Sequence, residues 1–208
     1  MPLTFLVSAL VTLLVVVDPV GLAPTFLGIT EGQPLAVRRR IAFRACLIAG
    51  AILIGAALVG DWLLRQLGIT LPAFRIAGGL LLFAVAAEMV LGLRLRHAAQ
   101  DAEEAVEERA HDVAAFPLAI PMMAGPGAIT ATILLAGQAA YRPVWLATLM
   151  VAVIAATAAC LVSFLAAQQI GRLLGVTGNI VLSRLLGVIL AALAVQYVVD
   201  GLRAALGG

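Results

Sequence analysis

Residues 15–26 read VVVDPVGLAPTF and place a carboxylate, a glycine and two prolines inside a long apolar run near the N-terminus. Proline removes a backbone N–H and clashes with the carbonyl four residues back, so this run is not expected to form one continuous helix. An Asp followed by a Pro is typical of a helix start, with Asp as the N-cap and Pro at the first helical position. The pattern therefore predicts a helix that stops and restarts at Asp18.

The composition around this stretch is that of an integral membrane protein. Of the 208 residues, 63% are hydrophobic and 12% are charged, whereas a soluble domain is about half apolar and about a quarter charged. The net charge is only +2 and aromatic residues make up 5%, so no nucleic-acid partner is expected. We expect a multi-pass protein of the cell (inner or plasma) membrane, whose partners are the lipid bilayer and a small-molecule substrate.

Six apolar runs have about the 20 residues needed to cross the hydrocarbon core. They cover residues 3–29, 41–64, 71–93, 114–138, 144–169 and 180–204. A polar, acidic linker, residues 94–113, separates the third run from the fourth. Nine arginines lie at the side of the membrane that holds the joints after the first, third and fifth runs, and four lie at the other side. The positive-inside rule then predicts a cytoplasmic linker and both termini outside the cytoplasm.

The chain also repeats itself. RQLGIT at 65–70 returns as RLLGVT at 172–177, and Asp18-Pro19 aligns with Gly125-Pro126 at the same offset. The repeat continues at a slightly larger offset, where Arg75, Gly78 and Gly92 match Arg184, Gly187 and Gly201. Several matches in order indicate two related halves, residues 1–93 and 114–208.

Each half has three spans, an odd number, so the second half must enter the membrane from the opposite face. The predicted fold is therefore an all-α membrane protein of six transmembrane helices in two inverted three-helix repeats. Helices one and four are broken within the bilayer.

The second break lies in PLAIPMMAGPG, residues 117–127, with prolines at positions 117, 121 and 126. Irregular backbone at membrane depth is tolerated only where it is buried in protein or lines a cavity. A new helix start there presents free N–H groups and the positive end of the helix dipole, which suits a carboxylate. We therefore expect the carboxylate of a substrate to bind at Gly125–Ala128.

Asp18 has two interpretations. An intramembrane carboxylate is functional by default, and Asp18 would meet the ammonium group of a substrate. It would also carry a coupling proton, because burial favours the neutral form of an unpaired carboxyl group. Alternatively, Asp18 is only the N-cap of its half-helix and is satisfied by backbone N–H groups. Similarly, the hydroxyls of Thr25 and Thr130 either contact a ligand or bond the carbonyls of their own helices.

The predicted substrate site gathers the residues of both breaks. They are Asp18, Pro19, Gly21, Thr25, Gly125, Pro126, Gly127, Ala128 and Thr130. No metal site or cofactor is expected, since His97 and His111 in the acidic linker lack a recognisable ligand spacing. An enzyme is not expected either, because the chain has no Lys and nothing pairs a nucleophile with a base near the spans.

Two segments resemble the signature segments of the MarC family, DPVGLAPTF at 18–26 and PLAIPMMAGPGAIT at 117–130. FRIAGGLLL at 74–82 resembles the third-helix pattern of the family and RLLG at 184–187 its sixth. The resemblance covers essentially the whole chain. In the first segment, the family more often has Asn at the position after the glycine. This chain has Leu22 there, so no side-chain hydrogen bond is carried over to position 22.

Some members of that family are assigned as proton-coupled transporters of small neutral amino acids such as glycine and alanine. The resemblance thus implies a secondary transporter of this class. The alternatives are an exporter or channel for another small solute, and a structural or regulatory membrane protein without transport. Small residues crowd the later spans, so close helix contacts are expected, either within the chain or between copies of a homo-oligomer.

Overall fold

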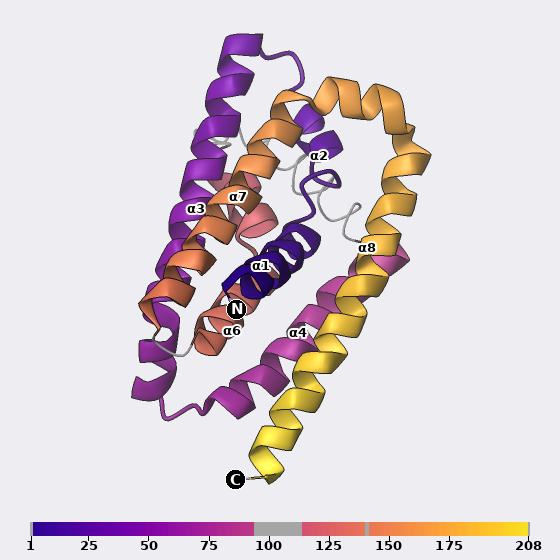
Figure 1. Cartoon of the computed structure of the whole chain (residues 1–208). Helices are drawn as coiled ribbons and strands as arrows, with labels where there is room; N and C mark the ends of the chain where they lie inside the picture. Colours follow the sequence, from indigo (N-terminus) through magenta and orange to yellow (C-terminus); the bar gives the residue numbers. More distant parts are fainter. Residues whose placement is uncertain (1, 94–113, 140–141, 208) are drawn as a thin grey trace.

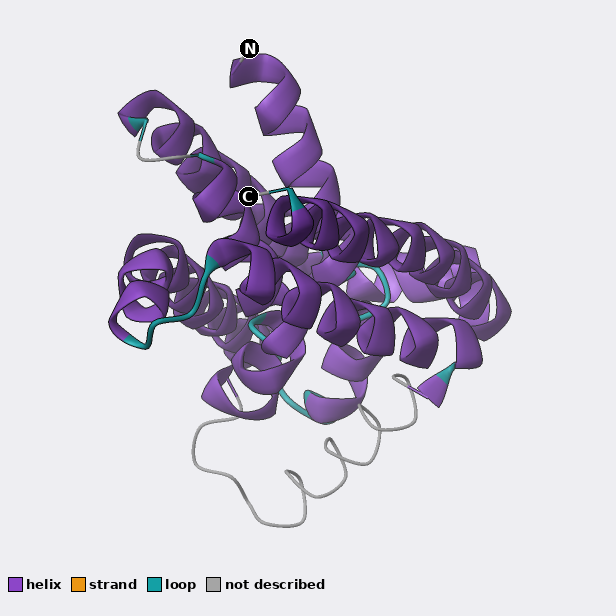
Figure 2. Ribbon diagram, turned by 90° about the horizontal axis from the view of Figure 1, so that it is seen from below, coloured by secondary structure: helices purple, strands orange, loops and turns teal. Residues whose placement is uncertain are grey.

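The computed structural model describes residues 2–93, 114–139 and 142–207, and the regular elements of that part are all helical (Figures 1 and 2). The predicted linker 94–113 lies outside the described residues. In chain order the elements are α1 (Pro2–Val17), α2 (Ala23–Ile29), α3 (Leu35–Gln66), α4 (Leu71–Leu91), the irregular segment η1 (Ala114–Met123), α6 (Pro126–Gln138), α7 (Pro143–Leu165) and α8 (Ala167–Leu206).

Two pairs of long helices flank the broken ones. α3 packs against α7 on one side, and α4 packs against α8 on the other (Figure 1). Between the pairs, α1 contacts α6, α7 and α8, while η1 and α6 contact α3. α1 is drawn almost end-on in Figure 1 and lengthwise in Figure 2, so it is strongly tilted against the flanking pairs.

Glycines allow α4 and α8 to approach closely. A β-carbon on Gly79 would lie 2.7 Å from the carbonyl oxygen of Ala194, and one on Gly201 would lie 2.9 Å from that of Pro72. Only residues without a β-carbon fit such contacts, and small residues are the usual means of packing helices within a membrane. The predicted crowding of small residues thus serves a contact within the chain.

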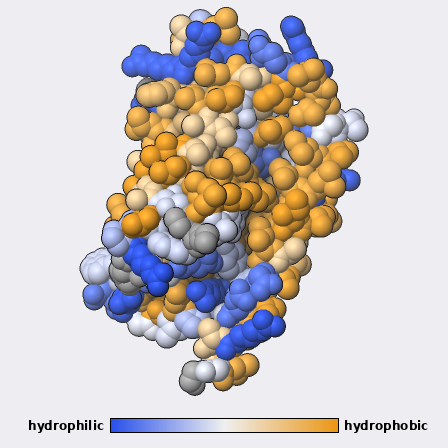
Figure 3. All heavy atoms as spheres, in the orientation of Figure 1, coloured by the Kyte–Doolittle hydropathy of each residue, from blue (hydrophilic) through white to orange (hydrophobic). Residues whose placement is uncertain are grey.

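Large apolar side chains cover much of the outer surface. Figure 3 shows them over the middle of one face, with hydrophilic residues gathered at its two ends. Exposed examples come from all four flanking helices: Leu47, Leu80, Phe83, Ile154, Val188 and Val195. A soluble monomer rarely exposes so continuous an apolar surface. This band is suited to contact with lipid.

Within the described residues, four helices are long and apolar enough to cross a membrane: α3, α4, α7 and the part of α8 from Thr177 to Leu206. η1 and α6, bent by 58° at their junction, make a fifth span if they are taken together. α1 has 16 residues and is about 24 Å long, shorter than the roughly 30 Å core. The all-helical membrane fold is therefore confirmed, whereas the sixth span and the inverted repeat stay predictions.

Both predicted breaks are present, but only the second begins where the sequence indicates. α6 starts at Pro126 with Gly125 as its N-cap, as predicted. In the first break, α1 ends at Val17 and α2 begins at Ala23 with Leu22 as its N-cap. The prediction that Asp18 caps the restarting helix is therefore wrong: Asp18 opens a turn of several residues that precedes α2.

Candidate functional site

The turn between α1 and α2 folds around the carboxylate of Asp18, which is only 3% exposed. Asp18 has a φ of 53°, a left-handed conformation that Asp tolerates better than most residues. Its Oδ1 accepts a 2.9 Å hydrogen bond from the backbone N–H of Gly21. A β-carbon on Gly21 would overlap this carboxylate, so the turn requires glycine at that position.

The other carboxylate oxygen of Asp18 is bound from the opposite end of the chain. The hydroxyl of Ser183 in α8 donates a 2.8 Å hydrogen bond to Oδ2. Ser183 is buried and is not among the residues that the sequence predicts, although it stands directly before the repeated Arg184 motif. Asp18 therefore connects the first break to the last helix, and it is more than a cap satisfied by its own backbone.

Asn179 lies four residues before Ser183, so the two side chains share one face of α8. Asn179 is 4% exposed, and its Oδ1 has no hydrogen-bond partner among the described residues. A buried polar atom without a partner costs about 1–3 kcal/mol. The sequence offers only a weak signal for Asn179, namely a polar residue directly before the predicted sixth span.

The second break lies close to the first. A β-carbon on Gly127, in the first turn of α6, would lie 3.4 Å from Cγ1 of Val16, two residues before Asp18. Gly127 and Ala128 are buried, while Pro126 is exposed. The first N–H groups of any helix have no acceptor within that helix, and Gly125 has no side chain that could cap α6. Backbone donors without an acceptor in their own helix and a buried carboxylate are thus brought to neighbouring turns.

The other residues of the predicted substrate site have less distinct roles in the structure. Pro19 and Thr25 are buried in the first break and in α2. Thr130 is buried where α6 meets α4, since a β-carbon on Gly78 would lie 2.6 Å from Cγ2 of Thr130. The neighbouring Thr132 donates a 2.7 Å hydrogen bond to the carbonyl of Ala128, which is the purely structural use of a helical hydroxyl. Substrate contact by Thr25 and Thr130 stays a prediction.

A second polar cluster lies farther along α8. The side chain of Tyr197 lies within interaction range of those of Gln138 and Thr12. Tyr197 and Thr12 are buried, so these polar side chains bring α8 and α1 together inside the protein, with Gln138 of α6 exposed at the edge. Tyr197 is about 21 Å along the helix from Ser183 at 1.5 Å per residue, and the buried residues between them, such as Leu190 and Ala194, are apolar. The two clusters are therefore separate.

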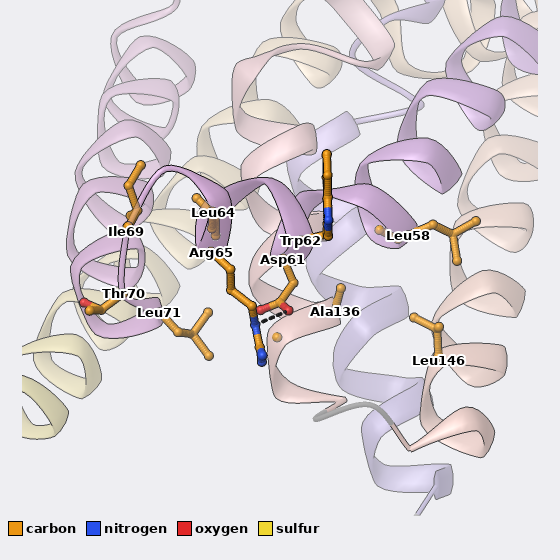
Figure 4. A pocket seen from close by; sticks show the side chains of 13 residues that line it. Leu58, Asp61, Trp62, Leu64, Arg65, Ile69, Thr70, Leu71, Ala136 and Leu146 are labelled. Carbon is orange, nitrogen blue, oxygen red and sulfur yellow. Dashed lines mark hydrogen bonds and ion pairs between the residues drawn. The ribbon is translucent and has the colours of Figure 1, made fainter.

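A recess of about 620 Å³ opens where α3 and α6 end and α4 and α7 begin. Figure 4 shows Asp61 and Arg65 pointing into it, joined by an ion pair of 3.0 Å. Part of its wall, Gly68–Thr70, belongs to the repeated RQLGIT motif. Among the described residues that line the recess, none belongs to the predicted substrate site. The recess is therefore a separate feature from the Asp18 site.

Within the described residues, no group of three or more His, Cys, Asp and Glu side chains could hold a metal ion. His97 and His111 lie outside the described residues.

Comparison with known proteins identifies relatives along the whole chain. A UPF0056 membrane protein of Methanocaldococcus jannaschii is 34% identical over 99% of this chain and 100% of its own length. A UPF0056 membrane protein of Archaeoglobus fulgidus is 37% identical over 96% of this chain and 93% of its own. The UPF0056 membrane protein YhcE of Escherichia coli is 34% identical, with 92% and 88% covered. No solved structure matches the chain significantly.

The family model for the MarC family of integral membrane proteins matches residues 3–206. Together with the relatives, this match extends the resemblance carried by the two broken-helix segments to the whole sequence. The chain therefore belongs to the MarC family of integral membrane proteins.

Proposed function

We propose that this protein is a secondary transporter of small neutral amino acids of the glycine and alanine class, coupled to protons and working by alternating access. One observation carries the proposal. A buried carboxylate, Asp18, stands at a break in the first helix, two residues after Val16, which lies against the start of α6, and it is hydrogen-bonded to the last helix. A buried carboxylate within a membrane protein marks a substrate or proton pathway.

The two breaks together suit a zwitterion. The free N–H groups and positive dipole end of α6 favour the carboxylate of an amino acid. Asp18 would meet its ammonium group. The start of α6 is closely packed, since a β-carbon on Gly127 would already lie 3.2 Å from Val85 and 3.4 Å from Val16. Such close packing favours a substrate with a hydrogen or a methyl group as its side chain.

Alternating access requires two halves that can move against each other, and the helix contacts support an inverted repeat. If the first half is exchanged for the second, α1–α7 contacts become η1–α3 contacts, α2–α7 contacts become α6–α3 contacts, and α2–α8 contacts become α6–α4 contacts. All of these contacts are present. In addition, α4 and α8, a pair that the exchange leaves unchanged, pack against each other.

Single residues support the same symmetry. Gly68 and Gly175, the matching glycines of the repeated RQLGIT and RLLGVT motifs, both adopt left-handed backbone, with φ of 69° and 60°. Arg75 and Gly201 touch, since a β-carbon on Gly201 would lie 3.1 Å from Cβ of Arg75. The matching pair also meets, with Nη2 of Arg184 3.8 Å from the β-carbon position of Gly92.

The proton would act through Asp18. While Asp18 is charged, the Gly21 N–H and the Ser183 hydroxyl stabilise it, as hydrogen bonds to a carboxylate do. Protonation weakens both bonds and so loosens the connection between the first break and α8. In an inverted-repeat transporter this is the interface at which the halves rock. Proton binding at Asp18 would thus bias the access of the site.

The arginines support an orientation with both termini outside the cytoplasm. Arg38–Arg40 at the start of α3 and Arg172 near the α7–α8 joint lie at the same end of the molecule (Figure 1). Arg65 and Arg142 lie at the opposite end, near the α3–α4 and α6–α7 joints. The end with more arginines would face the cytoplasm, which suits a protein of the cell membrane.

Uptake by the purified protein in liposomes tests this function. Labelled glycine and alanine should accumulate when an inward proton gradient is imposed, and preloading with unlabelled glycine should accelerate entry of the label. Accelerated exchange requires a carrier, because a channel shows no such stimulation. If neither amino acid enters faster than in protein-free liposomes at any gradient, the proposed transport is wrong.

A further inference from the structure

We propose that Asn179 and Ser183 form the wall of the Asp18 site on the α8 side and select ligands that carry an N–H-bearing ammonium group. This inference rests on the proposed function, because it assigns two further residues to the same substrate site. Neither residue belongs to either broken helix.

The side-chain amide oxygen of Asn179 is unpaired among the described residues. It is almost fully buried, and a buried polar atom is nearly always hydrogen-bonded. A bound ligand with a hydrogen-bond donor would satisfy it. The atom is an amide oxygen, which accepts hydrogen bonds, so the missing partner is a hydrogen-bond donor.

Asn179, Ser183 and Asp18 together carry three kinds of oxygen acceptor. Asn179 and Ser183 lie one helical turn apart, about 6 Å along α8, and Ser183 contacts Asp18 directly. The wall therefore presents an amide oxygen, a hydroxyl oxygen and a carboxylate. A primary ammonium group has three N–H donors and one positive charge, which matches a set of three oxygen acceptors of which one is charged.

The acceptors Ser183 and Asp18 have no polar counterpart in the other half of the repeat. Since Arg184 matches Arg75 in the repeat, the position that matches Ser183 is Phe74, which packs against the apolar core. Asp18 itself is matched by Gly125. The ammonium-binding groups are thus concentrated between the first break and α8, while the free N–H groups of the second break face the other end of the substrate. This asymmetry would give a zwitterion one orientation.

Thermal unfolding of the purified protein in detergent, in sodium-free buffer, tests the inference. The probes are glycine and N,N,N-trimethylglycine, which keeps both charges but has no N–H donor. The variants are Asn179→Leu, which removes the acceptor at similar volume, and Ser183→Ala. Ser163→Ala is the matched control, since Ser163 is a buried serine of α7 outside the site.

We expect glycine, but not trimethylglycine, to raise the unfolding temperature of the wild type. Asn179→Leu should unfold at a higher temperature than the wild type without ligand, because it removes an unpaired buried polar atom. It should nevertheless need about tenfold more glycine for the same shift. Ser183→Ala should weaken glycine binding as well, and Ser163→Ala should not. A purely structural Asn179 would instead make Asn179→Leu less stable at all glycine concentrations.

The inference is overturned if Asn179→Leu binds glycine as well as the wild type does, or if trimethylglycine stabilises the wild type as strongly as glycine. Stabilisation by NaCl that depends on Asn179, without an effect of glycine, would also overturn it in favour of a metal-cation site. If Asn179→Leu does not fold, Asn179→Ala gives the same comparison. Failure of the proposed function is distinguishable, since the wild type itself would then respond to no neutral amino acid.

Discussion

The hydroxyl of Ser183 donates a 2.8 Å hydrogen bond to the carboxylate of Asp18, across 165 residues of sequence. The bond joins the break in the first helix to the last helix, inside a protein whose outer surface is apolar. This buried bond connects the first helix to the last. Binding of a substrate or a proton at Asp18 would therefore affect both halves of the protein.

The strength of this bond can be measured with a double-mutant cycle of Asp18→Asn and Ser183→Ala. Asn keeps the shape of Asp and tolerates its left-handed backbone, but its amide can still hydrogen-bond the Ser183 hydroxyl, so the cycle measures how much more strongly Ser183 binds a carboxylate than an amide. We expect a coupling free energy of about 1 kcal/mol, which is typical of side-chain hydrogen bonds between membrane helices. The measurement is reversible unfolding in mixed micelles. Additive effects of the two substitutions would show that the carboxylate of Asp18 binds Ser183 no more strongly than an amide does.

Substitution by alanine should have opposite effects on stability at two glycines of the first broken helix. Gly21→Ala places a β-carbon on the Asp18 carboxylate, so it should destabilise the protein by about 1–3 kcal/mol and abolish amino-acid uptake. Gly28→Ala is the control, since a β-carbon there meets nothing within 4 Å. In helix α2 it should stabilise by about 0.5–1 kcal/mol. Thermal unfolding and glycine uptake check both variants, and normal uptake by Gly21→Ala would contradict the described turn.

The close contact of α4 and α8 makes a similar prediction for the scaffold. Gly79→Ala would bring a β-carbon to 2.7 Å from the carbonyl oxygen of Ala194, and overpacking of this kind costs about 1–3 kcal/mol. Gly55→Ala in α3, where a β-carbon meets nothing within 4 Å, should be neutral or stabilising. Thermal unfolding of both variants checks this. Equal unfolding temperatures would mean that α4 and α8 are farther apart than described.

The sequence predicts those helix starts that are determined by neighbouring residues. Gly125-Pro126 is an N-cap followed by proline, and α6 begins there. Thr70 caps α4 through a 3.3 Å hydrogen bond from the N–H of Ala73, one residue before the predicted third span. The apolar runs are also largely helical, as lipid requires, although α8 begins at Ala167, within the predicted fifth run 144–169.

The first break lies where the sequence predicts it, but the start of the next helix does not, because the partners of Asp18 are distant in sequence. Asp-Pro reads as a helix start, but Asp18 bonds Gly21 and Ser183 and takes a left-handed backbone, so α2 begins only at Ala23. Nothing near Asp18 in the sequence identifies a partner in the last helix. The same holds for Asn179, whose importance lies in a missing partner that only a three-dimensional structure reveals.

Proton coupling through Asp18 is the central claim, and uptake of labelled glycine by Asp18→Asn in liposomes tests it most directly. The wild type and the variant are compared with and without an inward proton gradient. The account predicts that the gradient accelerates uptake by the wild type, whereas any uptake that Asp18→Asn retains is independent of the gradient. Acceleration of Asp18→Asn by the gradient to the same extent as the wild type would contradict the claim.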